Sequence, residues 1–373
     1  MRNRPTPASH SAGGSAMPST TNLSRLVRLV ASIAVLVLVG GAAIERSRTV
    51  DTPTADHVYA NDNLNGANGS PSASPSASQS AKAKAAAKAK GKSTAPGFTG
   101  SSAYIPGSGQ TYLGAAGDSQ ALSRATGIPL SDHAYAFFSG KVPVGRMITV
   151  KDTGSWASVA AAAPGSTIYN NIVRWAQTIK ARGGVIMFAY HHEPEGSNSA
   201  HYGTAAQYIA AYRHVVTIFR AQGVRNVNYT WQMTAYAFRA SSSDSRYASR
   251  WYPGDAYVDS VGADAYNWSS CGQGNGKWQE LKDLGDPVLA FARAHGKRAA
   301  FPEFASDADS RRAQWTYNAL AYIAANRSMF TGAFYFYRPP TVAANSDCKW
   351  PLSTSAEYLA YASLGRNRAY FTP

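Results

Sequence analysis

Residues 101–373 contain eight short apolar segments rich in β-branched and aromatic residues, with helical patterns between several of them. The candidate strands are residues 111–117, 134–139, 146–150, 184–191, 227–234, 259–266, 298–304 and 332–337. The candidate helices are residues 167–181, 204–221, 279–295 and 309–325, with Thr204 as the N-cap of the second. Strands joined by crossover helices form a parallel sheet, and eight of them in about 270 residues predict a closed (β/α)8 TIM barrel. A doubly wound open sheet is the competing α/β fold, but the sequence offers no Gly-rich phosphate loop to support it.

The first hundred residues have a different composition. Arg25 and Arg28 precede an apolar run at residues 29–44, which is slightly short for a full membrane span and is typical of a secretory signal. We therefore expect residues 1–46 to be either a signal peptide or an uncleaved signal anchor that holds the protein at the cell membrane. Residues 47–100 are rich in Ser, Pro, Ala and Lys, and such a segment cannot bury enough apolar surface to order itself, so we expect a disordered linker. This organisation predicts an extracellular protein.

The net charge of +15 is shared along the chain, since residues 1–100 hold only 11 of the 36 Lys and Arg residues. No basic helix or zinc-finger spacing is present, so we expect no nucleic-acid partner. His192-Glu193 could begin the zinc motif H-E-x-x-H, but Gly196 stands where the second histidine would be. No G-x-S-x-G nucleophile elbow is found either. We expect no metal and no cofactor.

Ionisable residues follow the fourth candidate strand, which runs into His191, His192, Glu193 and Glu195. Glu303 ends the seventh candidate strand in the same way. Both strand ends would meet at the same rim of a barrel, where enzymes of this fold place their chemistry. Two carboxyl groups in one cleft are what glycoside hydrolysis requires, whereas a single glutamate at a strand end is as well explained by a salt bridge.

Several longer motifs now resemble a known family. They are His192-Glu193 after an apolar strand, residues 208–220, residues 226–231, Pro302-Glu303-Phe304 and residues 251–267, where Tyr-Pro-Gly-Asp leads to Gly-x-Asp-x-Tyr. Together they resemble glycoside hydrolase family 26, and the resemblance covers most of residues 105–365. This family consists mostly of β-mannanases, which are retaining enzymes on a clan A (β/α)8 barrel.

The resemblance implies roles for individual residues. Glu193 would be the general acid/base and Glu303 the nucleophile, with their carboxyl groups about 5–5.5 Å apart as in retaining sites. His192, Asp264 and Tyr266 would support them, and the Tyr266 hydroxyl would hydrogen-bond to Glu303. The flanks depart from the family pattern, because Pro-Glu-Gly follows Glu193 where Met-Asn-Gly is common. The resemblance assigns no role to Glu195, for which we expect a rim salt bridge, and it leaves His191 unassigned.

Aromatic residues near the predicted rim are candidates for sugar contact, because sugar rings present apolar faces to aromatic rings. Trp231 ends the fifth strand and Trp268 follows Tyr266, so we expect both to contact substrate. On the eighth strand the usual subsite tryptophan of the family is not evident, and Tyr335 occupies this region as a candidate substrate-binding or supporting residue.

Cys271 and Cys348 fall in the loops after the sixth and eighth strands. Both loops would emerge on the catalytic face, and an exported chain meets oxidising conditions, so we expect a disulfide; two free thiols are the alternative. The full expectation is an exported, monomeric, retaining endo-β-1,4-mannanase acting on a β-linked polysaccharide. The alternatives are a family member that acts on xylan or mixed-linkage β-glucan, and a non-catalytic carbohydrate-binding pseudoenzyme.

Overall fold

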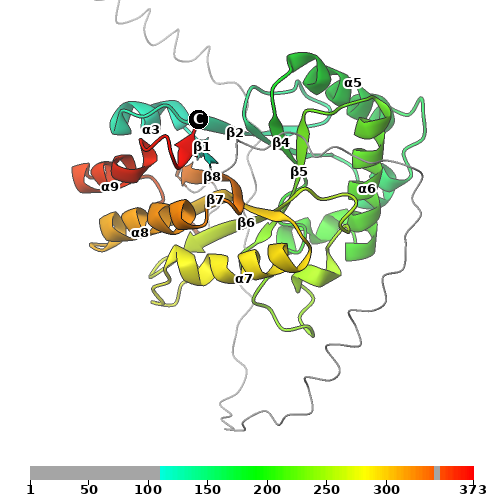
Figure 1. The fold of residues 1–373 in the computed structure, drawn as a ribbon. Coiled ribbons are helices and arrows are strands. Elements are labelled where there is room, and N and C mark those ends of the chain that lie inside the picture. Colours follow the sequence, from blue (N-terminus) through cyan, green and yellow to red (C-terminus); the bar gives the residue numbers. More distant parts are fainter. Residues whose placement is uncertain (1–109, 340–344) are drawn as a thin grey trace, which may run out of the picture. The chain divides into compact units, whose positions relative to one another are not determined.

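Eight parallel strands close into a barrel in the computed structural model, which describes residues 110–339 and 345–373 (Figure 1). The barrel strands are β1 (Thr111–Gly117), β2 (Ser131–Phe137), β3 (Met147–Lys151), β4 (Ile186–Tyr190), β5 (Val227–Thr234), β6 (Ser260–Asn267), β7 (Arg298–Ser306) and β8 (Phe330–Tyr337). Each strand pairs with the next, and β1 pairs with both β2 and β8, which closes the ring. A short ninth strand, β9 (Phe371–Thr372), pairs with the start of β1. The predicted eight-stranded parallel barrel is confirmed.

Helices cover the outside of the barrel. They are α3 (Ser119–Thr126), α4 (Trp156–Ala160), α5 (Thr167–Arg182), α6 (Ala205–Ala221), α7 (Leu281–Ala294), α8 (Arg312–Ala325) and α9 (Ser355–Gly365), with short 3₁₀ helices at Ser197–Tyr202 and Ala248–Arg250. Helices α7, α8 and α9 lie side by side, and α5 packs against α6 (Figure 1). The four predicted helices correspond to α5, α6, α7 and α8. Within the described ranges, the connections from β2 to β3 and from β5 to β6 contain no α-helix, and none was predicted there.

Helix α6 begins where the sequence predicted. The Thr204 hydroxyl accepts a hydrogen bond from the Gln207 backbone N–H (3.4 Å), and the Gln207 side chain accepts one from the Thr204 N–H (2.8 Å), which forms a capping box. Helix α9, which was not predicted, begins with the same arrangement at Thr354 and Glu357. In both helices the residues that form the cap lie within four consecutive positions.

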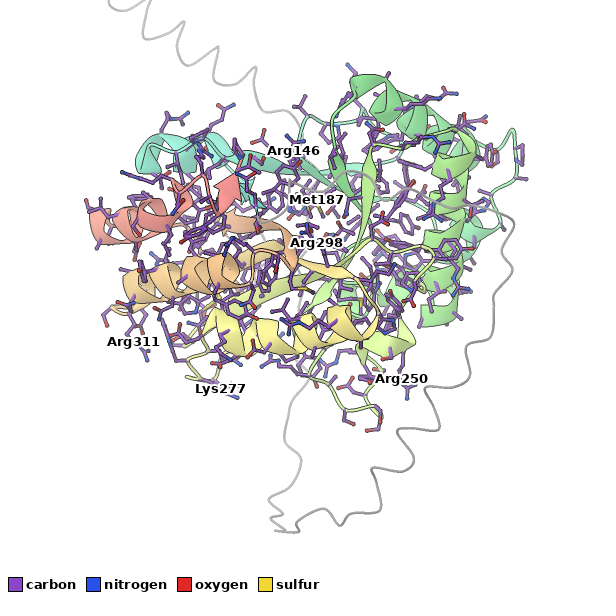
Figure 2. The ribbon with its side chains drawn as sticks, viewed as in Figure 1. Arg146, Met187, Arg250, Lys277, Arg298 and Arg311 are labelled. Atoms are coloured by element: carbon purple, nitrogen blue, oxygen red, sulfur yellow. A yellow bond between two sulfur atoms is a disulfide. The ribbon has the colours of Figure 1, made fainter. Side chains whose placement is uncertain are left out.

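The strands divide the core into two layers. Outward-facing residues such as Tyr229 and Trp231 of β5 pack against the helices, while a separate apolar cluster fills the barrel interior and includes Met187 and Phe334. Figure 2 shows Met187 among the strands, with Lys277, Arg250 and Arg311 at the periphery.

The inward residues of the barrel are partly polar, and this explains one misplaced boundary. Strand β2 was expected at residues 134–139 but spans Ser131–Phe137. Ser131 and His133 are buried, so a search for apolar residues missed them.

The expected leader at residues 1–46 and linker at residues 47–100 lie outside the described residues. None of the helices in the described part of the chain is long and apolar enough to cross a membrane.

Candidate active site

Glu303 reaches the barrel interior because β7 departs from regular alternation beside it. Phe301 and Phe304 both pack in the outer layer, with ring centroids 6.3 Å apart, although an odd spacing would normally place them on opposite faces. Pro302 and Glu303 lie between them, and the pairing of β7 with β8 shifts register there. Strand irregularities often re-aim side chains at active sites, and proline is tolerated at them because it has no N–H to donate. Glu303 is thereby delivered, fully buried, to the carboxyl end of the strands.

Two tyrosine hydroxyls hold the Glu303 carboxyl group. Tyr266 of β6 donates to Oε2, and Tyr135 of β2 donates to Oε1. Burial raises the pKa of Tyr135 well above its usual value, and the charge of Glu303 raises it further, so this hydroxyl keeps its proton. Each carboxyl oxygen thus has its own donor, which fixes the plane of the group. The predicted bond from Tyr266 is present, and the bond from Tyr135 was not foreseen.

A chain of hydrogen bonds crosses the barrel interior below this carboxyl group. The Pro302 carbonyl lies 2.9 Å from Nδ1 of His133, whose Nε2 lies 2.8 Å from the Thr149 hydroxyl. Thr149 donates to the Gln232 side-chain oxygen (2.8 Å), and the Gln232 amide nitrogen lies 2.9 Å from each oxygen of Asp264. All of these side chains are buried, so the chain ties the Glu303 strand to Asp264 through rigid elements.

Asp264 occupies the centre of a group of acids. Burial raises its pKa well above the usual value, and the charges of Glu303, Glu193 and Glu195 raise it further, against the lowering effect of the Gln232 amide. These four carboxyl groups therefore lie close together, and the strand ends had predicted this for Glu193 and Glu303. Neighbouring acids in a low-dielectric site cannot all ionise together, which is the usual way in which enzymes separate the roles of paired carboxyls.

Glu193 lies in a tight turn directly after β4. His191 and Glu193 both have positive φ angles, 53° and 48°, a conformation that non-glycine residues rarely adopt. The turn is held because the Glu193 N–H donates to the Gln232 carbonyl of β5 (3.0 Å) and the Glu193 carbonyl accepts from the Ser199 hydroxyl (3.0 Å). Strained backbone that its surroundings stabilise in this way is typical of functional sites.

His191, which had no predicted role, supports this turn from behind. Trp156 Nε1 donates to its Nδ1 (3.2 Å), so Nε2 carries the proton and donates to the Ser199 hydroxyl at 3.2 Å. Burial lowers the pKa of His191 well below its usual value, which keeps the ring neutral. The Trp156–His191–Ser199 chain therefore positions the backbone of Glu193.

His192 is buried on the other side of the turn. Its ring packs edge-on against Tyr135 with the centroids 5.6 Å apart, and Tyr135 in turn contacts Glu303. His192 thus lies between the Glu193 turn and the residues that hold Glu303. Its predicted role in supporting the site stays a prediction.

The rim salt bridge expected for Glu195 is wrong. Its side chain is only 6% exposed, and Oε1 accepts hydrogen bonds from both the N–H and the hydroxyl of Thr234, each at 2.7 Å. None of the ion pairs among the described residues includes Glu195. Burial therefore raises its pKa to about 8, with a smaller contribution from the charge of Glu193. The β4 turn pulls this residue inward, away from solvent and from cations.

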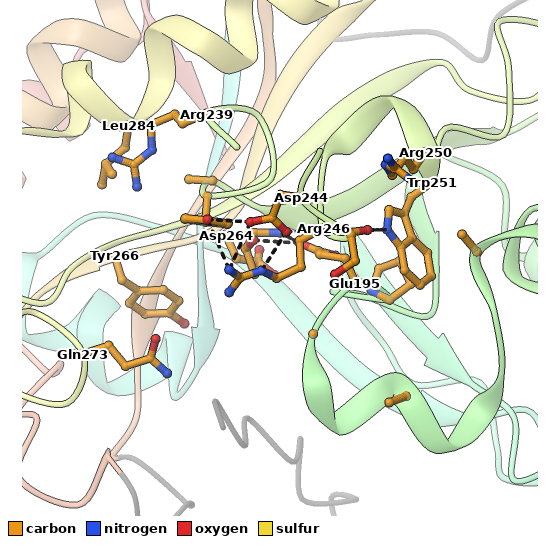
Figure 3. Close-up of a pocket in the computed structure, with 18 of the residues that line it drawn as sticks. Glu195, Arg239, Asp244, Arg246, Arg250, Trp251, Asp264, Tyr266, Gln273 and Leu284 are labelled. Carbon is orange, nitrogen blue, oxygen red and sulfur yellow. Dashed lines mark hydrogen bonds and ion pairs between the residues drawn. The ribbon is translucent and has the colours of Figure 1, made fainter. Parts of the chain in front are cut away.

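A cavity of about 1000 Å³ opens beside these acids, between the loops that follow β4, β5 and β6 (Figure 3). Glu195, Asp264, Tyr266 and Trp268 line it. Because Tyr266 also donates to Glu303, the cavity lies next to the catalytic candidates. This volume is at the upper end of the range of about 300–1,000 Å³ that ligand pockets span.

Of the three aromatic candidates, only Trp268 lines this cavity. Trp231 is fully buried in the outer layer against Tyr252 and Phe291, so the structure corrects its prediction as a sugar contact. Tyr335 is also fully buried and faces away from the barrel axis, where its hydroxyl donates to the Trp350 carbonyl (3.1 Å). Both side chains lie on the outer face of their strands, which faces the helices. The positions of these residues in the sequence did not show which face they occupy.

Cys271 and Cys348 form a disulfide that joins the loop after β6 to the loop after β8, as predicted. The Gly272 N–H donates to the Asp347 carboxylate (3.1 Å) beside it. In the part of the chain that the structure describes, no cluster of three or more His, Cys, Asp or Glu side chains could hold a metal ion.

Sequence reasoning missed Tyr135, His133, Thr149 and Gln232. A signal for some of them was present, because polar residues recur at every second position of β5, at Asn228, Thr230, Gln232 and Thr234. Such alternation in a strand that is buried on both faces marks the side that lines the barrel.

The glycosyl hydrolase family 26 model matches residues 162–333, a segment that contains both Glu193 and Glu303. The chain is 30% identical over 197 residues to Endoglucanase H of Acetivibrio thermocellus, an alignment that covers 51% of this chain and 21% of that protein. The chain therefore spans only about a fifth of the length of this curated relative.

Two solved structures are similar. An endo-β-1,4-mannanase from Cellulomonas fimi is 24% identical, with 60% of this chain and 55% of that chain covered and a TM-score of 0.42. A family 26 β-mannanase from Bacteroides ovatus is 15% identical, with 70% and 90% covered and a TM-score of 0.47. The family match confirms the resemblance that the sequence motifs indicated.

Proposed function

We propose, on the premise that residues 162–333 belong to glycosyl hydrolase family 26, that the protein is a retaining glycoside hydrolase that cleaves a β-linked polysaccharide. Glu303 would be the nucleophile and Glu193 the general acid/base. The observation that carries this proposal is the Glu303 carboxyl group, which is fully buried at the barrel mouth and held by one tyrosine hydroxyl on each oxygen.

In the first step, Glu303 attacks the anomeric carbon while Glu193 protonates the oxygen of the departing sugar, and a glycosyl-enzyme forms. In the second step, Glu193 removes a proton from water, which then displaces Glu303. The donors on Glu303 suit this cycle, because they fix the carboxyl group in one orientation before the attack. The strained turn holds the Glu193 backbone in place for the same reason.

We propose β-1,4-mannan as the first substrate to test, with internal cleavage. A specific observation favours a second candidate, since the relative that is 30% identical to this chain carries the name endoglucanase. A β-glucan is therefore the alternative substrate, and xylan completes the set. We further propose that the enzyme is exported and monomeric, with residues 1–46 as its signal or anchor and residues 47–100 as a linker.

The test is hydrolysis of mannan, mixed-linkage β-glucan and xylan by the wild type and by Glu303→Ala. We expect reducing sugar from one polymer with the wild type and a loss of about 10⁴-fold or more in the variant. NMR of the first product should show a retained anomeric configuration. If both proteins are inactive on every polymer but still bind one of the polymers, the pseudoenzyme alternative is supported. Release of the inverted anomer would contradict the assigned role of Glu303.

A further inference from the structure

Glu195 carries an oxygen atom that the described protein leaves unpartnered. Thr234 fixes the carboxyl group by donating two hydrogen bonds to Oε1. Oε2 is buried and has no hydrogen-bond partner among the described residues. Glu195 is only 6% exposed, and it lines the cavity (Figure 3). A buried polar atom without a partner destabilises the protein, so native structures retain such atoms for a reason.

The surroundings of Glu195 keep it protonated. Glu193 of the same loop and Asp264 of β6 are acids, and Tyr208 of α6 is a neutral hydroxyl whose pKa is raised by burial. Burial, and to a smaller extent the charge of Glu193, raise the pKa of Glu195 to about 8.

The arginines of the same cavity do not pair with Glu195. Arg246 binds Asp244 at 3.2 Å, and Arg250 donates to the Ser242 carbonyl at 2.9 Å. Arg239 is the third, and burial lowers its pKa. None of the three forms an ion pair with Glu195 in the described ranges.

The position of the proton follows from the hydrogen bonds. Both Thr234 donors occupy Oε1, so the proton of the neutral acid resides on Oε2. Oε2 is therefore a donor on a side chain that lines the cavity, two residues from the acid/base candidate. Trp268 lines the same cavity and is half-buried, and sugars pack on aromatic rings of this kind.

We propose that Glu195 is a substrate-binding residue, which donates a hydrogen bond from Oε2 to a hydroxyl oxygen of a sugar unit bound in the cavity beside the reacting bond. This proposal rests on the proposed function, because it takes the ligand to be a β-linked oligosaccharide. Glu195 then contributes to affinity and to the choice of sugar, and it takes no part in breaking the bond. A protonated acid of this kind can distinguish sugars by the position of one hydroxyl group.

Two substitutions test the proposal. Glu195→Gln keeps the acceptor for Thr234 and places an N–H₂ donor where Oε2 was, but it does not titrate. Glu195→Ala removes both. Asp118→Asn is the matched control, because this exposed carboxyl group follows β1 at the same barrel mouth, lies outside the cavity and caps α3, where asparagine caps equally well.

The measurement is kcat and KM between pH 5 and pH 10 on mannohexaose, cellohexaose and xylohexaose. For the hexaose that the wild type cleaves, we expect KM to rise about tenfold in Glu195→Ala at pH 6, with kcat within about threefold. Wild-type KM should rise as the pH passes through about 8, because the donor is lost. Glu195→Gln should keep a KM within about threefold of the wild type at pH 6 and show no such rise. Asp118→Asn should follow the wild type throughout.

Other outcomes separate this proposal from the proposed function. A wild-type KM in Glu195→Ala at every pH, with lowered stability only, would mean that Oε2 binds a structural water and would overturn the inference while hydrolysis stands. If the KM of Glu195→Gln rises with pH through about 8 as the wild-type KM does, the inference is also overturned. If no hexaose is cleaved, calorimetric binding decides: weaker binding by Glu195→Ala supports the inference without the hydrolase, and no binding to the wild type refutes both.

Discussion

Glu195, in the loop after β4, and Glu357, in the first turn of α9, are both buried glutamates, but only Glu357 contacts a cation. The carboxylate of Glu357 accepts two hydrogen bonds from Arg312, each at 2.9 Å, and two more from the backbone N–H groups of Ser353 (2.7 Å) and Thr354 (3.1 Å). Burial acts to raise its pKa, but the bonds from Arg312 and from the backbone hold it below the usual value. Glu357 is an ionised structural group that links α8 to α9.

Glu195 is as little exposed as Glu357, but it lies deeper in the protein and has different partners. Two neutral donors share one oxygen, none of the cations among the described residues pairs with it, and its pKa rises to about 8. A cationic partner together with the depth of burial therefore decides whether a buried carboxyl group is ionised. The roles of the two residues differ as well. Both oxygens of Glu357 accept hydrogen bonds from the protein, whereas Glu195 retains one oxygen for the proposed ligand. Glu303 is a third case, with one neutral donor on each oxygen.

The largest expected effect distinguishes Glu193 from Glu195, its neighbour in the same loop. Glu193→Ala should lower the hydrolysis of polysaccharide by about 10²–10⁴-fold, because the leaving oxygen loses its proton donor. With a dinitrophenyl glycoside of the accepted sugar, the rate of the first step should be nearly that of the wild type, because this leaving group needs no proton. Added azide should then react with the glycosyl-enzyme of Glu193→Ala and give the glycosyl azide. Glu195→Ala should show no dependence on the leaving group. If Glu195→Ala shows the same dependence on the leaving group as Glu193→Ala, Glu195 takes part in proton transfer and is not only a binding residue.

The next effect concerns the cation that Glu195 lacks. Arg312→Met should lower the free energy of unfolding by about 3–5 kcal/mol, because it leaves the Glu357 carboxylate buried without its partner. Arg312→Met combined with Glu357→Gln should recover most of that loss, because the neutral amide oxygen still accepts from the Ser353 and Thr354 N–H groups. Urea unfolding would measure the recovery. A double variant as unstable as the single one would show that the packing of the Arg312 stem, rather than the charge, is what matters.

A pH experiment on stability compares the two environments directly. Because the pKa of Glu195 is about 8 in the folded protein against an ordinary 4.5, the folded state binds this proton more tightly, and wild-type stability is lost as the pH rises between these values. Glu195→Gln does not titrate, so its stability relative to the wild type should increase by about 3 kcal/mol from pH 4 to pH 7. Urea unfolding at both pH values measures this difference. A constant difference would mean that Glu195 is ionised in the folded state.

The smallest effect tests the Glu303 arrangement. Tyr266→Phe and Tyr135→Phe should each lower kcat by about tenfold to a hundredfold, because each removes one hydrogen bond to a charged oxygen. The expected loss is in kcat rather than in KM if the hydroxyls act by orienting the nucleophile. Unchanged kcat in both variants would show that Glu303 needs no donors, and initial-rate kinetics on the accepted polymer suffice to decide.

Much of the scaffold could be predicted because its signals are local. An apolar strand or a capping residue such as Thr204 is recognisable within a few residues, and all eight barrel strands were placed within a few residues of their positions. The catalytic candidates Glu193 and Glu303 followed as well, since the ends of parallel strands must meet at one mouth. The Cys271–Cys348 pairing depends on the same rule.

Only the tertiary structure decided what surrounds those residues. Tyr135 reaches Glu303 from a strand 168 positions away, and no local pattern reports such a contact. Trp231 and Trp268 looked equivalent in the sequence, but the register of β5 in the closed barrel directs Trp231 towards the helices, whereas Trp268 follows the end of β6 and lines the cavity. The sequence by itself determined which side chains stand at the strand ends. The fold decided the ionisation of Glu195, because a pKa depends on burial and on the charges nearby in space.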